Sequence, residues 1–317
     1  MKRPLLSTLV VGLVLALASL PASAGTKAAS SKSVTAKPVA TAAAPTPRPW
    51  MSSDVGAAWS KGYKGQNTTI TVIDDFSSAT KLSGFLTGTT QSLRHGEWTK
   101  LEASLVAPSA TIATQNFGTT TAVKLASGRL NTLNLSYGSM ATAGYDPANI
   151  GWTARDKSAI DYAKLGKAVV VKSAGNDAIA IGGTNAAGKS DYLGMALTGA
   201  ASAIYVGALD RNGSTTNLAN LASYSNYAGS NTDVQNHFLT VGVTSSQMGL
   251  AGTSFAAPIV SGYSAILGSK FTTATPTQIT NQLLTTARTD TIAGYDPSIH
   301  GKGEASLSRA LAPTSIQ

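Results

Sequence analysis

Hydrophobic and polar positions along the chain alternate between short β-branched or leucine-rich runs and longer segments with helical spacing. Four runs are typical of buried strands: TTITVID (68–74), LNTLNLS (130–136), AVVVKSAGN (168–176) and AIYVGAL (203–209). The intervening spacing predicts helices near 95–106, 119–128 and 153–165. Alternating strands and helices predict an α/β domain with a mainly parallel sheet, whose ligands bind beyond the carboxyl ends of the strands.

A further helix is predicted to begin near Ser254, within GLAGTSFAAPIVSGYSAIL (249–267). Apolar side chains from Ile259 to Leu267 recur on one helical face, and Pro258 lies early enough for its missing N–H to cost little. A serine at this place has two interpretations. It caps the helix, or it is a nucleophile held at the positive end of the helix dipole.

The first 49 residues differ in composition from the rest of the chain. Lys2 and Arg3, an apolar stretch over 4–20 and the small residues Ala22-Ser23-Ala24 predict a signal peptide over 1–24, with a retained membrane anchor as the alternative. Residues 25–49 are rich in Ala, Ser, Thr, Lys and Pro, which predicts a linker or short pro-segment. The folded domain is then expected over 50–317.

Charge and cysteine content exclude several classes of function. The chain has no cysteine, which rules out disulfides and thiolate metal sites. Its net charge is +9, but residues 1–50 carry six of the Lys and Arg residues and no acid. The remainder is nearly balanced and has no basic cluster, so we expect no nucleic-acid partner.

A nucleophilic Ser254 would need a base and a group that orients the base. His95 begins an amphipathic helix, whereas His237 and His300 are expected at the surface. Asp74 ends the strand ITVID, and its neighbour Asp75 is expected to point the other way.

An amide is the fourth element of such a site. Asn176 follows the strand VVVKSAG, from which it could donate a hydrogen bond to a developing oxyanion. Alone, the Asp, His and Asn positions each also fit an ordinary turn or structural residue.

The joint arrangement of VIDD, HG, SAGND and GTSFAAP resembles the subtilisin-like serine peptidases, the subtilases. The order Asp, His, Ser is the one known for subtilisin. The likeness extends over roughly residues 55–312. It implies a three-layer α/β/α fold and hydrolysis of peptide bonds, with Asp74, His95 and Ser254 as the catalytic triad and Asn176 in the oxyanion hole.

The resemblance also implies how a polypeptide substrate binds. It would pair main chain to main chain, as an added strand, with two segments: Ser136, Tyr137 and Gly138, and Ser173, Ala174 and Gly175. No cofactor is required for this chemistry, and structural calcium, common in the family, has no recognisable loop here. We expect an exported monomer, periplasmic or secreted, free of the membrane once its signal is cleaved.

The sequence also departs from the family pattern. The histidine segment runs HGEWTKL, with Glu97, Trp98 and Lys100 where other residues are usual, and Phe76 replaces a usual glycine. These side chains are expected to affect the cleft or the base. The leader is also too short for the usual folded propeptide. We therefore predict an exported serine endopeptidase, with a catalytically silent peptide-binding domain as the alternative and an anchored structural domain as the third.

Overall fold

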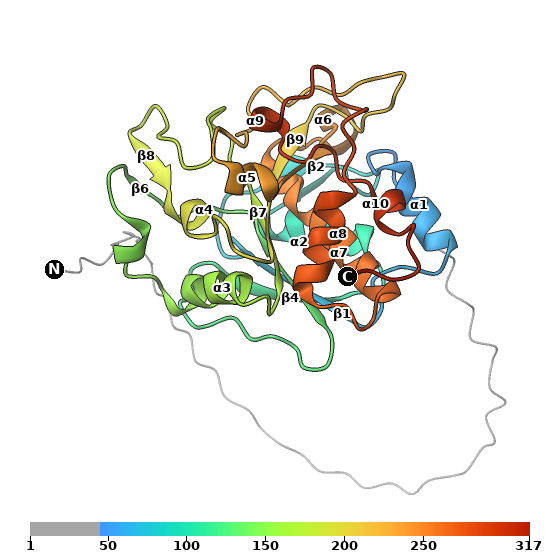
Figure 1. Ribbon diagram of the computed structural model, residues 1–317, viewed down its shortest axis with the longest axis horizontal. Helices are drawn as coiled ribbons and strands as arrows, with labels where there is room; N and C mark the ends of the chain where they lie inside the picture. Colours follow the sequence, from blue (N-terminus) through green and yellow to red (C-terminus); the bar gives the residue numbers. More distant parts are fainter. Residues whose placement is uncertain (1–44) are drawn as a thin grey trace, which may run out of the picture.

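A six-stranded parallel sheet forms the centre of the molecule (Figure 1). The computed structural model describes residues 45–317. The strands are β1 (Thr68–Asp74), β4 (Thr111–Asn116), β5 (Leu130–Leu135), β7 (Val169–Ser173), β9 (Ala203–Leu209) and β10 (Phe238–Gly242), in the spatial order β10-β9-β7-β5-β1-β4. The connection from β1 leads to β4 on one side and the connection from β5 leads to β7 on the other, so a crevice is expected at the carboxyl ends of β1 and β5.

Helices cover both faces of the sheet, as predicted. One core cluster joins the sheet to α1 (Ser53–Ser60), α2 (His95–Val106), α7 (Ala257–Lys270), α8 (Pro276–Thr285) and α10 (Leu307–Ala310). The other cluster includes α3 (Ala154–Lys164), α4 (Tyr192–Ala196) and α5 (Thr232–Asn236). In β1, Ile70 and Val72 belong to the first cluster and Ile73 to the second, as the strand period requires.

Helix α7 runs through the first cluster and is buried along all but its last residue. A Cβ added to Gly262 would lie 2.4 Å from Val106 Cγ1 of α2, and one added to Gly268 would lie 2.4 Å from Leu130 Cδ2 of β5. These glycines let α7 pack closely against both elements. The sequence predicted this helix, but its start near Ser254 is a separate 3₁₀ turn, η2 (Thr253–Phe255), and α7 begins at Ala257.

The remaining elements are short. Strands β2 (Leu82–Gly84) and β3 (Gln91–Leu93) form one antiparallel pair, and β6 (Met140–Thr142) and β8 (Lys189–Asp191) form another. Figure 1 shows β6 and β8 together at one margin of the domain. The other short helices are η1 (Pro147–Asn149), α6 (Ser245–Met248) and α9 (Pro297–His300).

The helix predicted over 119–128 is wrong, because that segment is irregular. The Asn131 side chain accepts from the Ala126 N–H and donates to the Ala126 carbonyl, both at 2.8 Å, and so takes the backbone partners a helix would supply. The sequence analysis also missed β4 and β10. Edge strand β4 is only partly buried, and β10 directly follows a polar segment.

The predicted signal peptide and most of the predicted linker lie outside the described residues. Near the linker's end, Arg48 Nη1 donates to the Thr87 carbonyl at 3.1 Å, so contacts with the domain begin before Trp50. Within residues 45–317, every helix is too short or too polar to cross a bilayer.

Candidate active site

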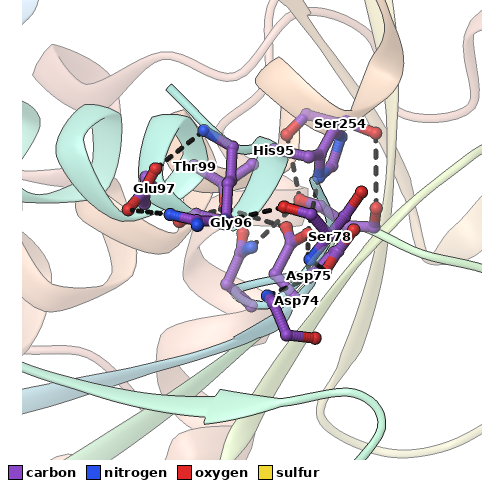
Figure 2. Close-up of polar contacts among 12 residues, drawn as sticks. Asp74, Asp75, Ser78, His95, Gly96, Glu97, Thr99 and Ser254 are labelled. Atoms are coloured by element: carbon purple, nitrogen blue, oxygen red, sulfur yellow. Dashed lines mark hydrogen bonds and ion pairs between the residues drawn. The ribbon is translucent and has the colours of Figure 1, made fainter. Parts of the chain in front are cut away.

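Asp74, the last residue of β1, lies at the carboxyl edge of the sheet and is 2% exposed. Its Oδ1 is 2.5 Å from His95 Nδ1 and accepts from the Asp75 N–H at 2.6 Å. Its Oδ2 accepts from the Thr99 hydroxyl at 2.8 Å. Figure 2 shows the carboxylate between its partners. Three donors hold one buried carboxylate, so it is fixed as the orienting group for the imidazole.

His95 is held in place by the backbone at the start of α2. The Gly96 N–H donates to the Asp75 carbonyl at 2.9 Å, and a Cβ at Gly96 would lie 2.8 Å from that oxygen. Only glycine fits this close approach. Glu97 accepts from the Arg94 N–H at 2.8 Å and pairs with the Arg94 side chain at 3.1 Å, which completes the cap. The hydrogen bond from the Arg94 backbone lowers the pKa of Glu97.

The unusual residues after His95 do not enter the cleft. Trp98 is fully buried in the core, and its Nε1 donates to the Leu82 carbonyl at 2.9 Å. Lys100 is exposed on the outer side of the helix. The expectation that these residues affect the cleft or the base is therefore wrong for Trp98, since the core absorbs its ring.

Ser254 lies in the 3₁₀ turn that precedes α7. Its Oγ donates to the Ser136 carbonyl at 3.3 Å, and the adjacent Phe255 ring lies 5.7 Å from the His95 ring, centroid to centroid. The structure therefore pairs Asp74 with His95 and places Ser254 next in the chain to Phe255, whose ring lies near that of His95. In this conformation the serine hydroxyl is directed to Ser136.

Asn176 is oriented by the turn that carries Ser254. Its Oδ1 accepts from the Thr253 N–H at 2.8 Å and from the Thr253 hydroxyl at 3.0 Å. That hydroxyl in turn accepts from the Gly175 N–H at 3.0 Å. Since the amide oxygen is engaged, Nδ2 is the end of the side chain that remains to donate to a ligand.

A pocket of about 120 Å³ opens beside Ser254 and Asn176. Its walls include all six residues predicted to bind substrate: Ser136, Tyr137, Gly138, Ser173, Ala174 and Gly175. Gly175 has φ 108°, and a Cβ there would lie 2.4 Å from Asn226 Nδ2, so the position requires glycine. The six predicted binding residues thus line one pocket together with Asn176 and Ser254.

The Tyr137 side chain is held in place by contacts with Asp156, Arg155 and Phe117. Its hydroxyl donates to Asp156 Oδ1 at 2.8 Å, the Arg155 guanidinium lies 5.1 Å from its ring centroid, and Phe117 stacks on it at 6.0 Å. Burial, followed by the charge of Asp156, raises the pKa of the Tyr137 hydroxyl. The segment's backbone therefore has a fixed position at the pocket wall.

The other histidines and Asp75 lie outside the site. Asp75 accepts from the N–H groups of Ser77 and Ser78 in a turn. His237 is half-buried and bonds the Asp233 carbonyl. His300 was expected at the surface, which is wrong: it is 4% exposed because it packs against β10, and burial lowers its pKa.

The sequence analysis did not single out three residues that shape the site: Thr99, Thr253 and Lys172. Thr99 and Thr253 orient Asp74 and Asn176, and ordinary helix and turn positions gave no signal for them. Lys172 did give a signal, because a lysine within VVVKS is a charge in a buried strand and must find a partner.

The sequence also matches a known protein family. The family model described as the subtilase family matches residues 80–303. The chain belongs to the subtilase family. The family consists of serine peptidases of the hydrolase class, and it implies polypeptide substrates. The search of curated proteins gives no match.

Solved structures show that this subtilase has the fold of known proteases. The structure of the prenylagaramide maturation protease PagA is 18% identical, with a TM-score of 0.54, and the match covers 81% of this chain and 96% of that one. A lanthipeptide protease is 17% identical, with a TM-score of 0.54, and the match covers 80% of this chain and 89% of that one. MycP1 from Mycobacterium smegmatis is 20% identical, with a TM-score of 0.52, and the match covers 87% of each chain. At these identities the matches establish the three-layer α/β/α fold alone.

Across residues 45–317, no group of three or more His, Asp or Glu side chains is placed to hold a metal ion.

Proposed function

We propose that this subtilase is an exported serine endopeptidase. The observation that carries the proposal is the 2.5 Å contact between Asp74 Oδ1 and His95 Nδ1, in a chain that also has a serine in the 3₁₀ turn before the buried helix α7. With Nδ1 committed to Asp74, Nε2 is the nitrogen left to act as a base.

The chemistry follows from this arrangement. The Ser254 hydroxyl rotates from the Ser136 carbonyl to His95 Nε2 and attacks the substrate carbonyl as the imidazole takes its proton. Asp74 stabilises the resulting imidazolium. Asn176 Nδ2 and the Ser254 N–H then hold the oxyanion, and His95 gives the proton to the leaving amine as the peptide C–N bond breaks. Water, with its proton taken by His95, then hydrolyses the Ser254 ester, which releases the acid product and restores the serine hydroxyl.

The partner is a single polypeptide strand bound between the two wall segments of the pocket. Backbone groups of Ser136–Gly138 and of Ser173–Gly175 would pair with its main chain. The signal-like N-terminus supports export to the periplasm or beyond, where the enzyme would act as a monomer without a nucleic-acid partner. N-terminal sequencing of the exported protein tests that processing.

The alternative is a domain that binds peptides without cleaving them. The hydrogen bond from Ser254 to Ser136, in place of one to His95, favours it. A silent binder, however, has no need for Asp74, His95, Asn176 and Ser254 in one cluster.

A fluorophosphonate probe separates these functions. We expect covalent labelling of Ser254 in the purified protein and its loss in His95→Ala, because the hydroxyl then has no base. His237→Ala is the matched control, since this histidine lies outside the site, and it should label like the unmodified protein. A well-folded protein that stays unlabelled would establish the silent binder instead.

A further inference from the structure

The pocket beside Ser254 contains a buried ion pair that the catalytic chemistry does not use. Lys172, on central strand β7, has a side chain 2% exposed, with Nζ 2.9 Å from Asp191 Oδ2. The same Nζ donates to the Ser173 carbonyl at 2.6 Å. Both charged residues line the pocket together with Ser254 and Asn176. A buried lysine in a valine-rich strand is costly unless paired, so its partner fixes the polarity of this space.

Asp191 is built into the pocket wall by the backbone around it. It ends β8, opposite Met140 of β6, and its Oδ1 accepts from the Ser139 N–H at 2.9 Å. A Cβ at Gly138 would lie 3.0 Å from Asp191 Oδ2, and one at Gly194 would lie 3.2 Å from it. Both glycines leave the space that the carboxylate fills.

The two charges are unequally exposed. The Asp191 side chain is 21% exposed, whereas that of Lys172 is almost fully screened from solvent. A ligand in the pocket therefore meets the carboxylate directly and the ammonium only through its field. Each carboxylate oxygen has one donor from the protein and retains a lone pair for another.

We propose that the Lys172–Asp191 pair determines specificity, and that the pocket selects a neutral amide side chain, Gln or Asn, on the substrate residue preceding the scissile bond. This inference rests on the proposed peptidase function. An amide N–H can donate to Asp191 without adding a charge. A pocket of about 120 Å³, several times the ~30 Å³ share of one water, suits a side chain of that size.

Other side chains lose on physical grounds. A cationic side chain is attracted by Asp191 but repelled by Lys172 close behind it, so little Coulomb energy offsets its desolvation. An anionic side chain is attracted by Lys172 but repelled by Asp191, which lies nearer to it. An apolar side chain would shield Asp191 from water and give it no donor in return.

The first experiment compares peptides that differ only at this residue: Gln, Leu, Lys or Glu. We expect kcat/KM for the Gln peptide to exceed that for each of the others by about 10- to 100-fold, the range for a hydrogen bond to a charged group. Product-like peptides ending in the same four residues are titrated calorimetrically against Ser254→Ala, which measures the same preference as affinity without catalysis.

Two single variants carry opposite expectations. Lys172→Met leaves Asp191 as the sole charge and should shift the preference to the Lys peptide. Asp191→Asn leaves Lys172 unpaired and should shift it to the Glu peptide. Either variant suffices if the other does not fold, as judged by its melting temperature. Lys189→Met is the matched control, because this exposed lysine lies on β8 outside the pocket and its loss should leave the preference unchanged.

Equal turnover and affinity for the four peptides would overturn the inference, as would unchanged preference in folded Lys172→Met and Asp191→Asn. Failure of Ser254 to label with a fluorophosphonate would overturn the catalytic proposal alone. The calorimetric preference of Ser254→Ala would still support or refute the role of the ion pair.

Discussion

Replacing Thr99 by valine removes one of the three donors to Asp74 while nearly preserving side-chain volume. Thr99 is fully buried, so water cannot replace the hydroxyl that donates to Asp74 Oδ2 at 2.8 Å. A hydrogen bond to a charged group contributes about 1.5–3 kcal/mol. We expect the free energy of unfolding at neutral pH to fall by roughly that amount.

Turnover should fall as well, because Asp74 is then less firmly held against His95. The upper limit is the loss of the aspartate's function altogether, about 10⁴-fold in kcat for such a triad, and losing one donor of three should cost far less, on the order of tenfold. KM should change little, since Thr99 is remote from the pocket walls. Steady-state kinetics and denaturant unfolding on the same preparation measure both effects.

The matched control is Thr99→Ser, which keeps the hydroxyl and removes the methyl group. It should recover most of the turnover lost in Thr99→Val. If the serine variant is as slow as the valine variant, packing of the methyl group and not the hydrogen bond positions Asp74, and this reasoning fails.

Two further predictions concern Asn176 and Glu102. Asn176→Ala should lower kcat by the loss known for the equivalent donor in subtilisin, about 100- to 1000-fold, with KM nearly unchanged; an unchanged kcat in folded protein would remove Asn176 from the site. Glu102 is fully buried in α2, neither carboxyl oxygen has a hydrogen-bond partner among the described residues, and burial raises its pKa well above the usual value. Above pH ~4.5 the Glu102 carboxyl ionises more readily in the unfolded chain than in the folded one, which favours unfolding. Glu102→Met removes this effect, so the free energy of unfolding should increase at pH 7. The increase should become smaller towards pH 4, where the carboxyl is protonated in both states. A gain that is the same at both pH values, measured by urea unfolding, would exclude ionisation as the cause.

Local pattern was sufficient for the elements that carry the catalytic residues. The periodicity from His95 onwards predicted α2 because that helix is amphipathic, and ITVID predicted β1 because every residue of the strand is buried. Strand β10 escaped notice because it is recognisable only by its pairing with β9, which a single sequence does not display. The buried position of His300 likewise depends on distant chain packing.

The site was predictable in its residues but not in its contacts. Motif order nominated Asp74, His95, Asn176 and Ser254; the fold pairs the first two and places the other two on one pocket wall. The hydrogen bond that turns Ser254 towards Ser136 depends on a side-chain rotamer, which no spacing encodes. The Lys172–Asp191 pair was hidden for a different reason: its members lie 19 positions apart along the chain and meet only through the β6–β8 pair.

The two sides of the site differ in how deeply the elements that carry them are buried. Ser254 precedes α7, which packs closely against the sheet and α2, so the packing of the core fixes the position of Ser254 and tolerates little change. The carboxylate of Asp191 comes instead from a three-residue strand at the margin of the domain. Substitutions there would change the polarity of the pocket and the pairing of Lys172, whereas the position of Ser254 is set by the core and would stay the same.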